Sequence, residues 1–299
     1  MGGLIALVIL VLFVSSRIAR SVLHPERETR EEAVALQIER GNLAPGEIDD
    51  YPMEKRELAV FDGTRLAYYW LRCGAGTNKA VVCAHGFGAR HEHMLKNAKQ
   101  YLARGYDVLL FDQRNHGASG GKRTTMGFLE RRDAMELVSL ARQEKGIVGL
   151  HGESMGAATA VLAACLTDAP PDFVVADCGY DDCFTQIRYV VAKREHIPPY
   201  PFIWVADAIT KLVAGFNYRE VSPARELAAR NGLPDVPVLF IHGTADKYVP
   251  VGASERLFAA KTGKKALYIC EGAEHVRSIS VDREKYERVL YSFLDEYGF

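Results

Sequence analysis

Residues 147–166 read IVGLHGESMGAATAVLAACL and join a short apolar run to an alanine-rich segment through a serine between glycines. The apolar run predicts a buried strand, and the segment from Met155 onward predicts a helix. Ser154 lies at the turn between them, in a Gly-x-Ser-x-Gly pattern that lets strand and helix approach closely. Such a turn stores about 1–3 kcal/mol of strain and raises the serine hydroxyl above the sheet. We therefore predict that Ser154 is a nucleophile, against the alternative of an idle serine in a surface turn.

Eight short β-branched runs predict strands on both sides of this stretch, at residues 57–61, 66–71, 80–84, 107–111, 147–150, 173–176, 236–241 and 266–270. Amphipathic segments between the later runs predict helices at 129–144, 155–166, 252–260 and 284–297. The first two runs are separated only by Asp62, Gly63 and Thr64, which predicts a hairpin. The other runs alternate with helices. The sequence therefore predicts an α/β fold with a mostly parallel, eight-stranded sheet flanked by helices.

The interval between the sixth and seventh predicted strands is much longer than one crossover, which needs about a dozen residues. We predict a small helical cap inserted there, at about residues 181–222. The apolar and aromatic segment 197–205 has two interpretations. It forms either a wall for an acyl chain or the cap's own hydrophobic core.

A serine hydroxyl is a weak nucleophile at neutral pH and needs a histidine base that is oriented by a carboxylate. Among nine histidines, His275 directly follows the last predicted strand, and Asp246 directly follows the strand before it. The order Ser, Asp, His matches the order expected for a nucleophile on a strand-to-helix turn. Asp177, at the end of the sixth strand, is the rival carboxylate, with a helix-capping or hinge role as its alternative. We predict Ser154, Asp246 and His275 as the catalytic triad.

The tetrahedral intermediate of acyl transfer needs backbone N–H donors, each of which stabilises it by about 3–4 kcal/mol. One predicted donor is Met155, which follows the nucleophile. The other is Phe87, in the glycine-containing turn 85–88 after the third predicted strand. His85, in the same turn, is predicted to be structural.

The motifs 85–88, 112–119, 152–156, 242–246 and 274–275 occur in this order along the chain. Together they resemble the α/β-hydrolase superfamily, and most closely a bacterial branch described as serine aminopeptidase-like or lysophospholipase-like, several members of which carry an N-terminal hydrophobic anchor. The resemblance covers about residues 52–297 and implies one hydrolase domain at 52–299. It also implies a bracing role for the Asp-x-Arg-x-x-Gly-x-Ser segment 112–119. Dehalogenases and epoxide hydrolases of this superfamily have aspartate where Ser154 stands, which argues against their chemistry here.

Residues 4–14 form an unbroken apolar run, and Arg17, Arg20, Arg27 and Arg30 follow it. The uncharged stretch ends at Ser16, a little short of the roughly 20 residues that span a bilayer. We predict a retained membrane anchor at residues 1–23 and a linker at 24–51, with a signal peptide or a peripheral helix as alternatives. The arginines after the apolar run predict a cytoplasmic catalytic domain.

The composition argues against several other classes of protein. The 37 basic and 38 acidic residues give a net charge of −1, so the chain has no overall positive field that would attract nucleic acid. Neither H-E-x-x-H ligand spacing nor a glycine-rich phosphate loop is present, so we predict no metal and no cofactor. None of the six cysteines forms a C-x-x-C pair, which predicts reduced core thiols and a reducing compartment.

These features predict a carboxylesterase-like or lipase-like serine hydrolase that cleaves a small-molecule ester or thioester through an acyl-serine intermediate. The predicted anchor makes a lipid-derived substrate attractive. An aminopeptidase or amidase is the first alternative, and it would need an acidic residue in the cap to hold the substrate ammonium, such as Asp181, Asp182, Glu195 or Asp207. A non-catalytic binding protein is the second alternative.

Overall fold

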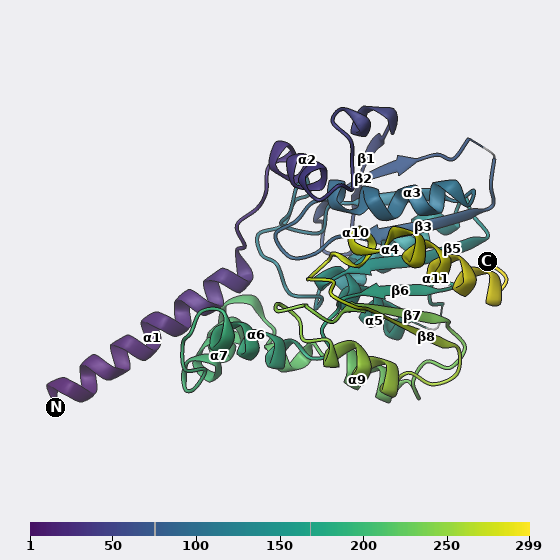
Figure 1. The fold of residues 1–299 in the computed structure, drawn as a ribbon. Helices are drawn as coiled ribbons and strands as arrows, with labels where there is room; N and C mark the ends of the chain where they lie inside the picture. The colour runs from purple at the N-terminus through teal and green to yellow at the C-terminus, as the bar shows by residue number, and fades with distance from the viewer. Residues whose placement is uncertain (75, 168) are drawn as a thin grey trace.

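The computed structural model of the chain describes residues 1–74, 76–167 and 169–299. In this part of the chain eight strands form one sheet in the order β1-β2-β4-β3-β5-β6-β7-β8 (Figure 1). Their bounds are β1 (Glu54–Ala59), β2 (Arg65–Leu71), β3 (Lys79–Ala84), β4 (Asp107–Phe111), β5 (Ile147–Glu153), β6 (Val174–Asp177), β7 (Val238–Gly243) and β8 (Lys265–Cys270). β1 pairs with β2, and β2 with β4, in antiparallel register, whereas all other neighbours are parallel. The predicted mostly parallel sheet and its first hairpin are confirmed.

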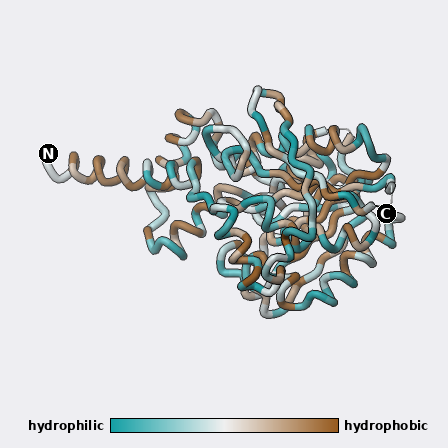
Figure 2. Tube along the Cα trace, turned by 90° about the horizontal axis from the view of Figure 1, so that it is seen from above, coloured by the Kyte–Doolittle hydropathy of each residue, from teal (hydrophilic) through white to brown (hydrophobic). Residues whose placement is uncertain are grey.

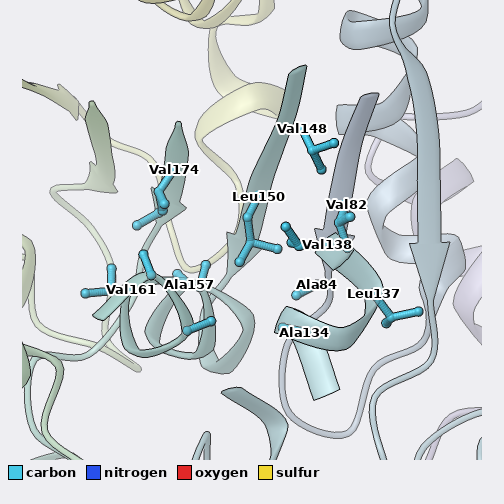
Figure 3. Packing of buried hydrophobic residues seen from close by; sticks show 14 of the residues in the cluster. Val82, Ala84, Ala134, Leu137, Val138, Val148, Leu150, Ala157, Val161 and Val174 are labelled. Atoms are coloured by element: carbon cyan, nitrogen blue, oxygen red, sulfur yellow. The ribbon is translucent and has the colours of Figure 1, made fainter. Parts of the chain in front are cut away.

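Helices cover both faces of the sheet. One face packs against α4 (Glu130–Arg142), α5 (Met155–Leu166), α8 (Pro223–Ala229) and α9 (Gly252–Ala260). Figure 3 shows Val82 and Leu150 of the strands packed against Val138 of α4 and Ala157 of α5. The opposite face packs against α3 (Leu95–Ala103) and α11 (Arg283–Glu296). The small α10 (Ser278–Val281) precedes α11.

The predicted helices are confirmed with small shifts at their ends, but α3 was not predicted. It follows a short 3-10 helix, η2 (His91–Met94), and buries the polar residues Lys96, Asn97 and Gln100 beside Leu95 and Ala98. Because polar side chains occupy part of its inner face, its sequence lacks the apolar stripe that marks an amphipathic helix.

The helical insertion after β6 is present and lies at the C-terminal end of the parallel strands. It contains α6 (Cys183–Lys193), α7 (Phe202–Ala214) and the 3-10 helix η3 (Tyr218–Glu220), after which α8 returns to the sheet. α6 and α7 share a hydrophobic cluster separate from the two sheet faces, which includes Tyr180, Ile187, Ile203 and Phe216. We call α6, α7 and η3 the cap.

The N-terminal helix α1 (Gly2–Leu23) projects from the body of the molecule as a long apolar rod (Figures 1 and 2). Among the described residues it alone is long and apolar enough to cross a membrane, with a mean hydropathy of 2.3, and a signal sequence would meet the same criterion. Its first half is exposed, whereas its last turns pack against α7, with Ile18, Ala19, Val22 and Leu23 buried. The sequence did not predict this packing.

The segment 24–51, predicted as a linker, packs against the hydrolase domain. It contains α2 (Arg30–Glu39), which Thr29 and Glu32 begin with a capping box, and the 3-10 helix η1 (Glu47–Asp50). Buried Gln37 of α2 contacts the His93 ring at 3.2 Å. The segment therefore fixes the point at which α1 leaves the domain.

Candidate active site

Ser154 lies on a sharp turn between β5 and α5. Its backbone has φ 56° and ψ −116°, a conformation that side chains other than glycine rarely adopt. A Cβ atom added to Gly152 would collide with the Gly156 backbone, and one added to Gly156 would collide with the Ala84 carbonyl. The two glycines therefore allow the strand and the helix to meet closely enough to hold Ser154 in this strained position.

The structure brings Ser154, Asp246 and His275 together, although they come from three different loops. The Nε2 atom of His275 lies 2.9 Å from the Ser154 Oγ. The Nδ1 atom of the same ring lies 2.7 Å from the Asp246 Oδ2. The ring thus connects the hydroxyl to the carboxylate through its two nitrogens, as a general base between a nucleophile and an orienting group requires.

Asp246 remains ionised because hydrogen bonds outweigh the effect of its burial. Burial alone would raise its pKa, but contacts with His242 and His275 and the Val249 N–H together hold the pKa well below the usual range. The Asp246 Oδ1 accepts hydrogen bonds from the backbone N–H groups of Tyr248 and Val249, at 2.8 and 2.9 Å. The loop after β7 therefore presents a charged carboxylate to His275.

Two residues of this site were not assigned from the sequence. Tyr248 stacks on His275, with ring centroids 5.0 Å apart, and so limits the rotation of the imidazole. The second residue is His242. It is fully buried and lies 3.2 Å from the Asp246 Oδ2, so it supports the carboxylate from behind. Both residues stand within four positions of Asp246, but one sequence gives no signal for such ring contacts.

The turn that carries Phe87 lies beside the nucleophile. A Cβ atom added to Gly86 would be 3.4 Å from the Ser154 Cβ. Among the described residues no protein group accepts a hydrogen bond from the Phe87 N–H, whereas the Gly88 N–H donates to the His116 Nε2 at 3.0 Å. Met155 is the first residue of α5, where backbone N–H groups have no intrahelical acceptor. Both predicted oxyanion donors therefore border the space above Ser154.

His85 contributes to this turn structurally. Burial lowers the pKa of its ring to about 3, so it is neutral. Its Nδ1 contacts the Gly86 carbonyl at 2.7 Å, and its Nε2 accepts the Gln113 N–H at 2.9 Å. His85 thus ties the oxyanion turn to the segment 112–119.

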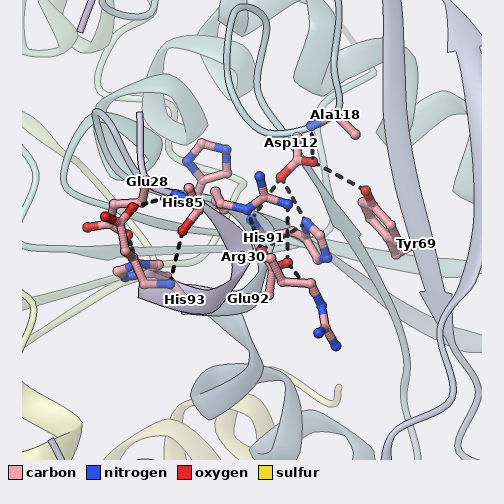
Figure 4. Close-up of polar contacts among 12 residues, drawn as sticks. Glu28, Arg30, Tyr69, His85, His91, Glu92, His93, Asp112 and Ala118 are labelled. Carbon is pink, nitrogen blue, oxygen red and sulfur yellow. Dashed lines mark hydrogen bonds and ion pairs between the residues drawn. The ribbon is translucent and has the colours of Figure 1, made fainter. Parts of the chain in front are cut away.

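The segment 112–119 is a hydrogen-bonded brace, and Figure 4 shows the contacts of its Asp112 with Ala118, His91 and Tyr69. The Asp112 carboxylate accepts the N–H groups of Ala118 and His91, at 2.8 and 3.0 Å, and contacts the His91 ring. Arg114 donates two hydrogen bonds of 2.6 Å to Asp133 of α4. Since His116 of the same segment holds Gly88, the brace fixes the turn that contains Phe87.

Comparison with known proteins identifies the family. Residues 81–288 match the alpha/beta hydrolase family. This chain is an α/β hydrolase. It is 35% identical over 298 residues to the Bacillus subtilis uncharacterized protein YqkD. The alignment covers 97% of this chain and 95% of YqkD.

Two further similarities bear on this α/β hydrolase. The Pyrococcus furiosus esterase Pf2001 shares its fold, with a TM-score of 0.69 and 23% identity over 91% of this chain and 98% of the esterase. The Aspergillus aculeatus thiohydrolase aneE is 37% identical over 116 residues, or 36% of each chain.

The Ser154 hydroxyl of this α/β hydrolase borders an apolar cavity of about 460 Å³. Ile187, Val190 and Val191 of α6 line the cavity, together with Met126 and Tyr180. Of the segment 197–205, however, only Ile197 lines the cavity. Ile203 lies in the cap core, and Trp204 is 52% exposed. Of the two interpretations of this segment, the structure therefore favours the cap's own hydrophobic core, with Ile197 contributing to the cavity.

Asp177, the rival carboxylate, lies away from His275 and belongs to a buried polar cluster behind the nucleophile. Its Oδ2 accepts a hydrogen bond from the Tyr286 hydroxyl at 3.1 Å. Glu153, next to Ser154, forms an ion pair of 3.0 Å with Lys96. Burial, and secondarily the charge of Glu153, raise the pKa of Asp177 to about 7. Because the His275 Nδ1 contacts Asp246 and the Asp177 carboxylate accepts the Tyr286 hydroxyl instead, Asp177 is not the partner of the candidate base.

This raised pKa predicts that stability falls as pH rises. Between pH 4 and 7, roughly, the folded chain holds a proton on Asp177 that the unfolded chain releases, so the free energy of unfolding decreases across this range. We expect Asp177→Asn to remove this decrease, because an amide accepts the Tyr286 hydrogen bond without ionising. Urea unfolding at pH 5 and pH 8 measures the effect, with exposed Asp235→Asn as the control. An equal pH dependence in all three proteins would contradict the prediction.

Two groups of described side chains have donor sets of the kind that bind metals. Cys178 lies with Asp246 and His275, and burial raises the pKa of its thiol well above the usual value, so the thiol stays protonated. His91 lies with Glu92 and Asp112, where Arg90 contacts Glu92 at 3.1 Å and His91 contacts Asp112. In both groups hydrogen bonds within the protein already engage the carboxylates. All six cysteines are free thiols, and only Cys73 is not fully buried.

Proposed function

We propose that this α/β hydrolase is a serine hydrolase that cleaves a carboxylic ester or thioester through an acyl-serine intermediate. The observation that carries the proposal is the single imidazole of His275, which contacts the Ser154 hydroxyl with one nitrogen and the Asp246 carboxylate with the other. A binding protein that had only kept the fold would have no need for a strained serine turn beside an ionised carboxylate.

The geometry supports a two-step reaction. The Ser154 Oγ attacks the acyl carbonyl while His275 accepts the hydroxyl proton, and Asp246 stabilises the resulting imidazolium. The N–H groups of Phe87 and Met155 stabilise the oxyanion. His275 then returns the proton to the leaving alcohol or thiol as the acyl–oxygen or acyl–sulfur bond breaks. Water, activated by the same ring, hydrolyses the acyl-serine and releases the acid.

The cavity at Ser154 favours an acyl chain as the group bound beside the nucleophile. Apolar side chains of α6 line it, and its volume is in the range of about 300–1,000 Å³ that small-molecule sites occupy. We therefore propose an ester of a lipid-derived acid, in keeping with the resemblance to lysophospholipase-like proteins. Because the similar protein aneE is described as a thiohydrolase, we include a thioester among the proposed substrates.

A substrate panel tests the proposal. We expect the full-length chain to hydrolyse p-nitrophenyl esters with a preference for long acyl chains, because each buried methylene adds about 0.8 kcal/mol. Short-chain and long-chain oxoesters and the matching thioesters separate chain length from leaving group. A clear preference for acetate esters would contradict a lipid-derived substrate. The enzyme would then be a hydrolase of small esters.

An aminopeptidase is the second candidate, and one observation favours it. Of the four cap acids, Glu195 alone lines the Ser154 cavity, where it could hold a substrate ammonium. Asp181 instead pairs with Arg256 at 2.6 Å, Asp207 binds Arg219 and the Tyr218 N–H, and Asp182 caps α6. Aminoacyl p-nitroanilides belong in the same panel, and faster turnover of these amides than of esters would favour the aminopeptidase.

We further propose that α1 anchors the protein in a membrane with the hydrolase domain in the cytoplasm. The length and hydropathy of α1 and the arginines that follow its apolar run 4–14 support this proposal. Cleavage of the hydrolase domain by a protease added outside intact cells would contradict this orientation.

A further inference from the structure

We infer that α1 forms one wall of the acyl cavity and brings the mouth of that cavity to the membrane surface, so that this hydrolase takes a single-chain acyl lipid from the bilayer. The inference rests on the proposed hydrolysis at Ser154 and deepens it. It names Ile18 and Val22 of α1 as residues that determine specificity.

The first step is the position of α1 in the cavity. Val14, Ile18 and Val22 line the same cavity as Ser154 and the apolar side chains of α6. They repeat every four residues, so they form one stripe along the helix. A helix predicted only as an anchor therefore supplies an apolar side of the active site.

The second step is that this half of α1 is fixed in place. Ile18 and Val22 are each 8% exposed, and they share the hydrophobic cluster of the cap. The Leu23 carbonyl accepts a hydrogen bond from the Thr124 N–H at 2.9 Å. The last turns of α1 are thus packed on one side and hydrogen-bonded at their end, as a permanent wall requires.

The third step is the length of the helix that remains free. At about 1.5 Å per residue, α1 is about 33 Å long, but residues 2–14 account for only about 20 Å. The hydrocarbon core of a bilayer is about 30 Å thick. A membrane crossed by α1 therefore reaches the packed half of the helix, and the cavity wall lies at the interface. Arg17 and Arg20 then lie about 24 and 28 Å along the helix, near the far edge of the hydrocarbon core, from which their long side chains can extend to the lipid headgroups.

The cap offers a matching apolar surface beside α1. Val213 of α7 lies in a groove with Ala19 and Arg20 of α1. Leu212, its neighbour, is 87% exposed, and Trp204 of the same helix is 52% exposed. Tryptophan and exposed aliphatic side chains next to a membrane helix are typical of a surface that sits in the interface.

The fourth step is the substrate. Arg17, Ser21 and Phe87 line both the Ser154 cavity and a second, larger groove of about 1280 Å³, which also contains His24, Arg27 and Glu28. An acyl chain in the apolar cavity and a polar headgroup in this groove would place the ester between them, beside Ser154 and the Phe87 N–H. A single-chain acyl lipid has this division into one chain and one headgroup.

The first experiment measures how fast Ser154 reacts with fluorophosphonates that carry a hexadecyl or a butyl chain. The full-length protein in phosphatidylcholine vesicles is compared with Val22→Trp and Ile18→Phe. A larger side chain in the wall shortens the cavity, so the ratio of the hexadecyl rate to the butyl rate should fall about tenfold or more. Leu12→Trp is the matched control, because Leu12 lies on the exposed half of the same helix, and it should keep the wild-type ratio.

The outcomes separate this inference from the proposed function. If neither probe labels Ser154 in the wild-type chain, the proposed hydrolysis itself fails. If both probes label it and the two wall variants keep the wild-type ratio, hydrolysis stands and α1 is not a wall. Butyl labelling of the variants shows that they are folded.

The second experiment tests the membrane contact with the two native tryptophans. Trp204 is exposed on α7, whereas Trp70 is 1% exposed within β2. In vesicles of brominated phosphatidylcholine we expect quenching of the Trp204 emission, and Trp204→Phe should remove the quenched fraction. Equal emission in brominated and ordinary vesicles would show that the cap stays in water and would overturn the supply of substrate from the bilayer.

Discussion

Ser154→Ala should abolish ester hydrolysis, lowering kcat by about 10⁴-fold or more. The expectation follows from the geometry, because the Ser154 Oγ is the group that the His275 ring contacts at 2.9 Å on the cavity side. The fold should be unaffected, since alanine differs only by the hydroxyl. Hydrolysis of p-nitrophenyl esters and covalent labelling by a fluorophosphonate measure the loss.

The matched control for this change is Ser139→Ala, an exposed serine of α4 whose hydroxyl donates a hydrogen bond to the Met135 carbonyl. It should keep full activity and labelling. Asp246→Asn adds a second test, because an amide beside His275 Nδ1 favours the wrong tautomer of the ring. A Ser154→Ala protein that is still labelled, or still turns over esters at the wild-type rate, would end the proposal of an acyl-serine.

Lys96→Met should destabilise the fold by about 3–5 kcal/mol, the cost of breaking a buried ion pair by removing one partner. The Lys96 ammonium is fully buried and lies 3.0 Å from the Glu153 carboxylate and 3.1 Å from the Val276 carbonyl. Its removal leaves Glu153, at the end of β5 next to Ser154, and Asp177, at the end of the neighbouring β6, buried without this cation. Urea unfolding at pH 8 measures the loss.

Lys99→Met is the control for this prediction. Lys99 lies on the same helix, but its partner Glu47 is partly exposed, so this change should cost at most about 1 kcal/mol. Adding Glu153→Gln to Lys96→Met should recover part of the lost stability, because it removes one of the uncompensated charges. If Lys96→Met costs no more than Lys99→Met, the cluster behind the nucleophile does not depend on the lysine.

The sequence predicted those parts of the molecule that have a local pattern. Strands of a parallel sheet end at one edge, so Asp246 and His275, each directly after a strand, could be placed near Ser154 from the sequence alone. The glycines around Ser154 indicated the strained turn, and the structure shows the close backbone contacts that require them. The roles of these residues in catalysis remain predictions for the variants above.

The other features depend on contacts between distant segments, and no local pattern marks them. An apolar helix that lies in lipid and one that packs against a cap have the same sequence pattern, so the place of α1 in the cavity wall could not be predicted. The stacking of Tyr248 on His275 depends on two loops whose conformations only the fold determines. α3 was missed because Lys96, which would normally mark an exposed face, is buried with an acidic partner.

The packing of α1 against the cap has a practical consequence for purification. Trimming a hydrophobic N-terminus is the usual route to a soluble form of an anchored protein, and a cut after Leu23 would look harmless from the sequence. In this molecule it would take Val14, Ile18 and Val22 away from the cavity and open that side to water. A soluble fragment prepared in this way would have a different binding site, and its substrate preferences would not be those of the native chain.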